Sequence, residues 1–453
     1  MLLMRCILLG SAAGIVAAPT AQAADLPTRK STPAEYVKIC NVGGMAGFVL
    51  PGSDTCFKIS GSIVAHVVGG NVNKEFLWSF APGAATVNPA ISARKLDALG
   101  FGARGTVDFD ARQDTAYGVL RSYVEAQFND GTGFQLGNAG LGTQSFINYA
   151  YIQWAGLTIG KANSFFSFYG GGEAWDNLIS PDQQGYNQPA LIAYTATFGG
   201  GYSASIAAQN ADSAGFSGEG TRIVAPGNGS LNGQRAPDIV ANIRVDQAWG
   251  AAQLSGVAHN VNVTDGASNQ DVWGWGVNGG VKINIPTWGP GDNVQAQATY
   301  TRNAAWFSGL PDAMDGEAQT FQGVNGNGLG PIYADTWSNG NGTWATPTAW
   351  SVSATMEHHF SPMFWIGPEF AFGEQHWSGL TATSGVPVNT YSAVGGGVLH
   401  WDPVPHLDFA LEMLYQYTHQ STPATFNAAV GAPTVFPNNT DGFVGRLFVT
   451  RDF

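Results

Sequence analysis

The chain has 453 residues, of which only 11% are charged and 12% are aromatic, and 61 are glycine. Soluble globular proteins carry roughly 25% charged residues, so this composition argues against an ordinary soluble surface. The net charge of −13 at pH 7 argues against nucleic acid as a partner.

Residues 1–23 have the features of a cleaved export signal. Arg5 precedes the apolar segment CILLGSAAGIVAA, and Ala21-Gln22-Ala23 forms a small-residue cleavage site. The mature part has no run of about 18 or more apolar residues, so we expect no membrane-spanning helix. A closed β-barrel is the other structure that spans a bilayer. The sequence therefore predicts an exported protein of the bacterial outer membrane, with a barrel over residues 57–453.

Two cysteines, Cys40 and Cys56, remain once Cys6 leaves with the signal. An even number of cysteines in an oxidising compartment favours a disulfide, which we expect within a periplasmic segment at residues 24–56. The alternative is two unlinked buried thiols. No CxxC or Cys/His spacing indicates a metal site, and we expect neither a metal nor a cofactor.

The segment from Gly102 to Phe128 alternates polar and apolar residues along both arms of a hairpin. A period of two is that of a strand, and a charged face backed by a continuous apolar face is typical of a transmembrane strand that lines a water-filled channel. An ordinary half-exposed hairpin has the same alternation. The polar face carries Arg104, Thr106, Asp108, Asp110 and Arg112 on the first arm and Arg121, Tyr123, Glu125 and Gln127 on the second.

About sixteen segments of this kind follow residue 56. Short breaks occur at residues 113–116, 155–156, 199–201, 246–248, 286–291, 360–362 and 402–405. Long polar stretches occur at residues 69–95, 129–143, 163–189, 210–237, 260–270, 303–346, 375–389 and 420–440. The two kinds alternate without exception, which is typical of outer-membrane barrels with periplasmic turns and extracellular loops. The predicted fold is all-β, a 16-stranded antiparallel transmembrane barrel.

Five basic residues have the phase of the barrel lumen and lie on the first, second, third and last strands, which closure makes neighbours. They predict a basic pore wall. The alternative is that they pair with Asp108, Asp110 and Glu125 on the same wall and hold the strands together. The five residues are Lys58, Arg104, Arg112, Arg121 and Arg446.

The last predicted strand, GFVGRLFVTRDF, ends on Phe453. Phe443, Leu447 and Val449 share its phase, and this pattern resembles the C-terminal signal that the barrel-assembly machinery reads. Arg451 departs from the pattern, because a hydrophobic residue is commoner there. We expect Phe453 to act as the assembly signal.

Several segments resemble the alphaproteobacterial porin family of rhizobia, Brucella and their relatives. They are VKICNVGGMAGFVLPGSDTCFKISGSI, VDFDARQDTAYGVLRSY, YAYIQWAGLTIGKANSFFSFYGG and IAYTATFGGGYSASI. The two cysteines around PGSDTC, the FDAR-DT hairpin and the GK-SFF step occur in the same order as in that family. The similarity covers essentially the whole mature chain and is weakest in the long loops.

The resemblance implies a trimeric general porin whose third extracellular loop, residues 163–189, folds inward and narrows the channel. The acids of this loop, Glu173, Asp176 and Asp182, would then face the basic wall and set a transverse field. The expected activity is passive diffusion of small hydrophilic solutes and ions. The expected partners are the lipid bilayer, lipopolysaccharide, the barrel-assembly machinery and two further copies of the chain.

Two other functions fit parts of the sequence. A substrate-specific channel would need an aromatic track, for which Tyr123, Tyr149 and Tyr151 are candidates, although wall-filling side chains explain them as well. A barrel-anchored adhesin or receptor is the other, and a lumen that is polar throughout argues against it. An enzyme is not expected, because no GxSxG elbow is present. His358 and His359 are adjacent on a strand and would point to opposite faces, so we expect no shared metal.

Overall fold

The computed structural model describes residues 38–70, 78–81, 84–87, 99–132, 144–168, 188–210, 223–224, 230–264, 266–309, 335–338, 342–379, 389–420 and 439–453. The expected signal at residues 1–23, and residues 24–37 of the expected periplasmic segment, lie outside the described residues.

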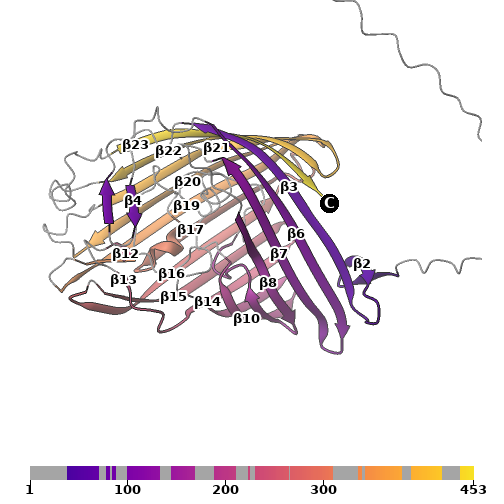
Figure 1. Ribbon diagram of the computed structural model, residues 1–453, viewed down its shortest axis with the longest axis horizontal. Coiled ribbons are helices and arrows are strands. Elements are labelled where there is room, and N and C mark those ends of the chain that lie inside the picture. Colours follow the sequence, from indigo (N-terminus) through magenta and orange to yellow (C-terminus); the bar gives the residue numbers. More distant parts are fainter. Residues whose placement is uncertain are drawn as a thin grey trace, which may run out of the picture. The chain divides into compact units, whose positions relative to one another are not determined.

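In the described part of the chain, sixteen antiparallel strands pair edge to edge, and β23 pairs with β3 to close the sheet into a barrel (Figure 1). Closure gives every strand two neighbours, so the backbone N–H and C=O groups find partners without water. The predicted sixteen-stranded barrel is confirmed. Its strands are β3 (Cys56–Gly70), β6 (Leu99–Thr115), β7 (Gly118–Thr132), β8 (Gln144–Trp154), β9 (Leu157–Lys161), β10 (Ala190–Gly199), β11 (Tyr202–Gln209), β14 (Asp238–Gln247), β15 (Gly250–Thr264), β16 (Asn269–Asn284), β17 (Asn293–Arg302), β19 (Trp344–Ser361), β20 (Phe364–Ser378), β21 (Asn389–Val404), β22 (Leu407–Gln420) and β23 (Asn439–Asp452).

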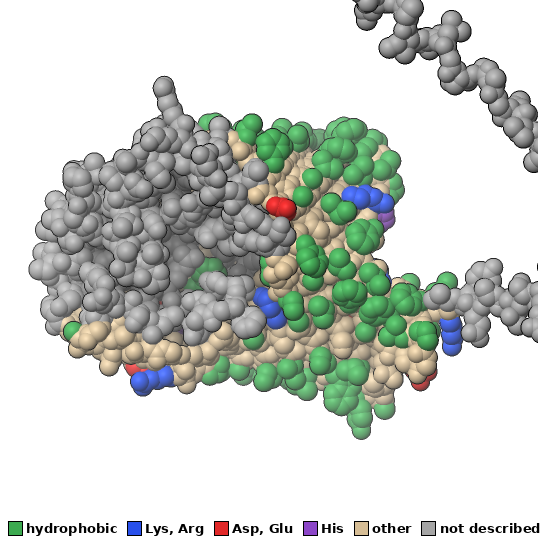
Figure 2. All heavy atoms as spheres, viewed as in Figure 1, with side chains coloured by type: hydrophobic (Ala, Val, Ile, Leu, Met, Phe, Trp, Pro, Cys, Tyr) green, Lys and Arg blue, Asp and Glu red, His purple; other side chains and the backbone are tan. Residues whose placement is uncertain are grey.

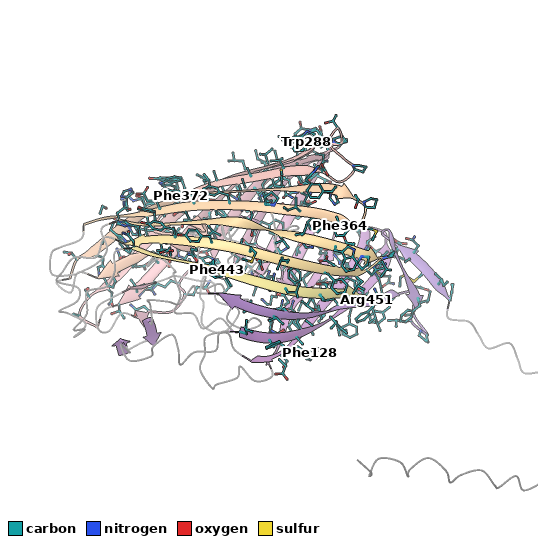
Figure 3. All side chains as sticks on the ribbon, turned by 90° about the horizontal axis from the view of Figure 1, so that it is seen from above. Phe128, Trp288, Phe364, Phe372, Phe443 and Arg451 are labelled. Atoms are coloured by element: carbon teal, nitrogen blue, oxygen red, sulfur yellow. A yellow bond between two sulfur atoms is a disulfide. The ribbon has the colours of Figure 1, made fainter. Side chains whose placement is uncertain are left out.

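Many apolar side chains lie on the part of the outer face that Figure 2 shows in colour. On β22, Leu411 and Met413 are 47% and 49% exposed, whereas Glu412 between them is fully buried. Phe128 and Phe443, which Figure 3 labels, are also exposed, at 51% and 46%. The two-residue alternation therefore separates a lipid-facing surface from the lumen, as predicted.

The expectation of a lumen that is polar throughout is wrong. Part of the lumen face of β20 to β23 and of β3 is apolar, and these side chains are removed from water. The buried residues with lumen phase include Val68, Val398, Leu414, Val444 and Phe448. Apolar side chains are stable there because they are buried rather than hydrated.

All the predicted short turns lie between consecutive barrel strands, to within a few residues. The predicted long loop at residues 260–270 is wrong, because β15 and β16 pair as far as Thr264↔Asn269 and leave only residues 265–268 between them. Asparagines suggest a break in this segment, but Asn260 and Asn262 alternate with Val261 and Val263 as a strand requires. Short and long connections therefore do not alternate without exception.

Short accessory elements occur in addition to the sixteen strands that form the barrel. The hairpin of β1 (Ile39–Val42) and β2 (Met45–Val49) pairs through β2 with the start of β3. The others are β4 (Trp78–Ala81), β5 (Ala84–Val87), β12 (Ile223–Val224), β13 (Ser230–Leu231), β18 (Thr336–Ser338) and the 3-10 helix η2 (Ala305–Ser308). Among the described residues, no helix has the length and apolar character needed to cross a membrane.

Replacing Leu411 by Arg places a charge near the middle of the lipid-facing side of β22. We expect the unfolding free energy, measured by urea titration in lipid vesicles, to fall by about 2–4 kcal/mol. Ser60→Arg is the control, because Ser60 lines the lumen, and its effect should stay within about 1 kcal/mol. Equal losses in both variants would contradict the assignment of the two faces.

Candidate functional site

The chain turns into the barrel directly after β9. Residues 162–168, which we call the third-loop root, contact lumen-facing side chains of β14, β15, β16 and β17. Because β9 itself pairs with β8 and β10, these contacts reach strands further round the barrel. The root therefore runs across the lumen face of several strands. Residues 169–187 of the expected constriction loop, including Glu173, Asp176 and Asp182, lie outside the described residues.

Polar side chains of the wall satisfy the backbone of the third-loop root. Amide groups donate to its carbonyl oxygens: Asn242 to Phe165 at 2.8 Å, Gln253 to Ser167 at 3.1 Å and Asn278 to Phe166 at 3.2 Å. Buried backbone carbonyls need such partners. Part of the polar lining thus binds the protein's own chain rather than the contents of the lumen.

Two aromatic rings of the root lie against glycines of β16. Phe166 is fully buried and Phe168 is 5% exposed. A Cβ atom at Gly280 would lie 2.3 Å from Cγ of Phe168, and one at Gly276 would lie 3.5 Å from Cζ of Phe166. Only glycine leaves room for the Phe168 ring. The sequence contains a signal for this contact: the lumen-phase glycines of GWGVNGG leave space that the phenylalanines of SFFSF fill. The two segments are far apart in the chain, so the sequence does not show that they meet.

A second segment enters the lumen after β17 and meets the first. Phe307 of η2 is 2% exposed, and its ring contacts that of Phe166 with centroids 5.0 Å apart. Nearby, the buried imidazole of His259 lies 2.7 Å from an oxygen of Asp238 and 3.4 Å from one of Asp335. Asp335 also accepts a hydrogen bond from the backbone of η2. The two inward segments therefore share one core.

The base of the third loop is held by the neighbouring wall. The hydroxyl of Tyr149 donates to Asn163 at 2.8 Å, and Lys161 Nζ donates to the Gln188 carbonyl at 2.8 Å. Gln188 in turn donates to the Tyr149 hydroxyl at 3.4 Å. Tyr149, a candidate for an aromatic track, thus binds both ends of the loop.

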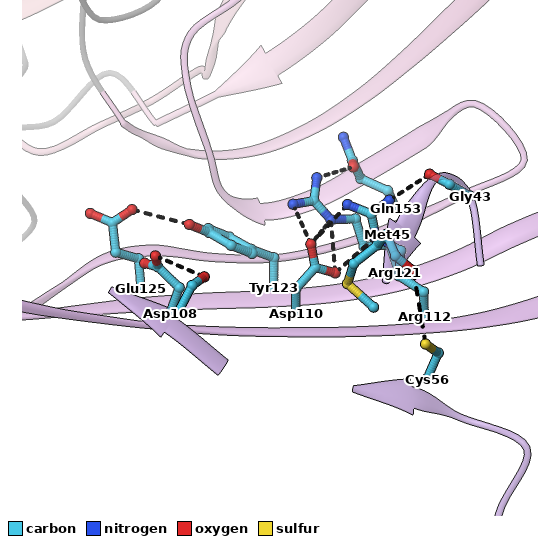
Figure 4. Close-up of polar contacts among 11 residues, drawn as sticks. Gly43, Met45, Cys56, Asp108, Asp110, Arg112, Arg121, Tyr123, Glu125 and Gln153 are labelled. Atoms are coloured by element: carbon cyan, nitrogen blue, oxygen red, sulfur yellow. Dashed lines mark hydrogen bonds and ion pairs between the residues drawn. The ribbon is translucent and has the colours of Figure 1, made fainter. Parts of the chain in front are cut away.

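Two of the predicted basic wall residues share one carboxylate (Figure 4). Arg112 Nη2 lies 2.9 Å and Arg121 Nη2 lies 2.8 Å from the same oxygen of Asp110. Pairing on the same wall, the alternative raised by the sequence, therefore holds for Arg112 and Arg121 with Asp110. The hydrogen bonds to Asp108 and Glu125 come from uncharged side chains: Ser60 donates to Asp108, and Tyr123 donates to Glu125.

The other three basic residues differ in environment. Lys58 is exposed to the lumen. Arg104 is 7% exposed, and its Nε donates to Asn129 at 3.0 Å. Arg446 is fully buried with Glu412, at 2.8 Å, and its guanidinium lies 4.2 Å from the ring centre of Phe448. All five lie on β23, β3, β6 and β7, which are adjacent as predicted.

Cys40 and Cys56 form the predicted disulfide, which ties the β1–β2 hairpin to the first residue of β3. The cysteines are therefore not free thiols.

The side chains of His358 and His359 do not diverge as the expectation of opposite faces implies. Both imidazoles reach Asp292 in the turn before β17, through Nδ1 atoms at 2.6 and 3.3 Å. Burial opposes ionisation of Asp292, but hydrogen bonds from the His359 backbone and both rings outweigh it and hold the pKa of Asp292 below its usual range. Within the described ranges, no group of three His, Cys, Asp or Glu side chains is placed to hold a metal ion.

An antiparallel barrel with an apolar outer face, charged lumen walls and a loop root folded inward defines the class of outer-membrane channels. Residues 25–445 match the family described as "Porin subfamily", and the chain belongs to this family. It is an outer-membrane general porin channel, and family membership implies a channel rather than an enzyme.

Similar proteins include "Porin Omp2b" of Brucella suis biovar 1 (strain 1330) and of Brucella abortus (strain 2308). Each is 29% identical over 320 residues, which cover 62% of this chain and 80% of the relative. Among solved structures, the outer membrane channel DcaP of Acinetobacter baumannii matches with a TM-score of 0.59 and 15% identity, over 90% of this chain and 100% of that one. At this identity, the likeness to DcaP shows the fold alone.

Replacing Gly280 by Val tests whether the contact of Phe168 with Gly280 holds the third-loop root on the lumen wall. The new side chain would overlap the Phe168 ring, at a cost of about 1–3 kcal/mol. The root should move off the wall, and the single-channel conductance in planar bilayers should rise and fluctuate.

Gly279→Val is the matched control. Gly279 is the neighbouring residue of opposite phase, and no described atom lies within 4 Å of its Cβ position. Wild-type conductance in both variants would show that the root does not limit the channel.

Proposed function

We propose that the chain, after cleavage of its signal at residues 1–23, forms a homotrimeric channel for passive diffusion of small hydrophilic solutes and ions. The observation that carries this proposal is the third-loop root. Its backbone is bound to the lumen face by side chains of β14, β15 and β16, which supports a third loop that folds inward. Residues 163–189 would then narrow the channel of each subunit.

We propose further that charges at this narrow part set the ion preference. Glu173, Asp176 and Asp182 of the third loop supply the acidic side, and the wall of β23, β3, β6 and β7 supplies the basic side. Two guanidinium groups share the single carboxylate of Asp110, so that cluster keeps a net positive charge. Lys58, exposed nearby, adds to it. Arg446 contributes less, because Glu412 compensates its charge in a buried pair.

The proposed partners follow from the two faces. The apolar outer face would contact the lipid bilayer and the neighbouring subunits, and the extracellular loops would meet lipopolysaccharide. Phe453 would be read by the barrel-assembly machinery. Its backbone extends the β23–β3 ladder, because its N–H donates to Gly61 and its carbonyl accepts from Gly61.

A substrate-specific channel is the second candidate. Tyr123 and Tyr151 have ring centres 5.3 Å apart, and the Arg121 guanidinium lies 4.8 Å from the Tyr123 ring. Such an arrangement can stack on a sugar or aromatic solute. Because Tyr149 binds the base of the loop, two of the three candidate tyrosines remain for an aromatic track, which favours the general channel.

Single-channel recording of the refolded mature protein in planar bilayers tests the proposal. A trimeric general porin should give large, ohmic steps that close in three levels. Small steps that one solute blocks would favour the specific channel instead. A folded barrel without conductance would contradict both.

Replacing Arg104 and Arg121 together by Ala tests the basic wall. The loss of two lumen cations should raise conductance and shift the salt-gradient reversal potential toward cations. Arg235→Ala is the control, because Arg235 is exposed and pairs with Asp271 beyond the barrel strands of the basic wall. Unchanged reversal potentials in the double variant would contradict the proposed field.

A further inference from the structure

The N-terminal hairpin reaches the lumen wall through its turn. Gly43 and Gly44 connect Val42 and Met45, with φ angles of +56° and +78°. Two consecutive residues in this region form the tight turn of a two-residue hairpin, which glycine adopts without steric cost. The two turn residues therefore have no side chains of their own to cover the backbone groups of the turn.

Few contacts attach this hairpin to the barrel. β2 pairs with β3 only at Phe48↔Phe57 and Val49↔Cys56. The Cys40–Cys56 disulfide adds a covalent link across a sequence separation of 16 residues. An isolated two-stranded hairpin is marginally stable in water, and a disulfide that closes such a loop limits the conformations open to it. The disulfide is thus the main constraint on the position of the turn.

The turn contacts a charged residue of the pore wall (Figure 4). Arg112 Nη1 donates to the Gly43 carbonyl at 2.8 Å, while its Nε and Nη2 donate to Asp110 at 3.0 and 2.9 Å. A Cβ atom at Gly43 would lie 3.3 Å from Val119 of β7. The turn therefore packs closely against the wall. All three guanidinium nitrogens of Arg112 donate hydrogen bonds.

Arg112 depends on this carbonyl because it shares Asp110 with a competitor. Arg121 binds the same carboxylate through Nε at 3.1 Å and Nη2 at 2.8 Å. One carboxylate cannot neutralise two guanidinium groups, and the Gly43 carbonyl supplies Arg112 with an additional acceptor. Without this carbonyl, Arg112 binds only Asp110, which it shares with Arg121. Its Nη1 would then donate to water in the lumen instead.

We propose that the N-terminal hairpin is a positioning element of the pore wall. The Gly43 carbonyl fixes Arg112 against Asp110, and the Cys40–Cys56 disulfide keeps that carbonyl in place. Loss of the disulfide frees the Arg112 side chain to enter the lumen and increases the preference of the channel for anions. This inference rests on the proposed channel, in which the wall of β3, β6 and β7 sets the ion preference.

Salt-gradient reversal potentials of the open oxidised channel, before and after a water-soluble phosphine, test the inference. The phosphine is oxidised to its oxide with oxygen from water, and the disulfide takes up two electrons and two protons to give two thiols. We expect the anion-to-cation permeability ratio to rise about twofold, the scale of a screened unit charge moved by a few ångströms. The variant Cys40→Ala with Cys56→Ala should show the same ratio without phosphine.

The decisive comparison repeats both measurements with Arg112→Gln. In that background, breaking or removing the disulfide should leave the permeability ratio unchanged, because no cation remains to be released. Arg235→Gln is the matched control: Arg235 lies away from the hairpin in a pair with Asp271, and this variant should keep the full twofold response.

Two results would overturn the inference. An equal response with Arg112→Gln would mean that the hairpin affects permeation by another route. An unchanged ratio in wild type, with both thiols shown to be free by maleimide labelling, would mean that Arg112 is held without the hairpin. Absence of conductance from the oxidised wild type would instead count against the proposed channel itself.

Discussion

Closure of the sheet between β23 and β3 is the constraint on which the other features depend. A backbone N–H or C=O group without a partner is costly in hydrocarbon, so a spanning sheet must have no open edge. The register from Val444↔Gly70 to Asp452↔Ser62 provides this closure. Once the sheet is closed, each strand has one lipid face and one lumen face, and the two-residue alternation assigns every side chain to one of them.

Closure also creates an interior that the chain partly fills with its own backbone. The third-loop root and η2 enter the lumen, and each brings carbonyl and N–H groups that water no longer reaches. Asn242 and Asn278 supply the hydrogen bonds, and Gly280 leaves space for Phe168. The lumen face is therefore specialised by region, with amides and glycines under the loop roots and charges on β3, β6 and β7.

The charged wall is a network rather than a row of independent charges. Asp110 joins Arg112 and Arg121, the Gly43 carbonyl binds Arg112 from the hairpin, and Glu412 neutralises Arg446 out of contact with water. Ion preference in such a wall depends on which guanidinium groups face water. A structural element outside the ring of barrel strands can change this without adding or removing a charge.

The sequence by itself determined the barrel, its two faces and the short turns, because alternation and turn composition are local and repeat along the chain. It favoured the Cys40–Cys56 link, because only these two cysteines follow the signal. It also placed Lys58, Arg104, Arg112, Arg121 and Arg446 on one wall, since closure follows from strand order. Only the tertiary structure decided which acid each cation meets, that Val398 and Phe448 occupy the lumen face, and that residues 260–264 and 269–270 are strand. Only the tertiary structure shows that the Phe168 ring packs against Gly280 and that the Gly43 carbonyl binds Arg112. These features join residues distant in sequence, and no local period encodes such a pairing.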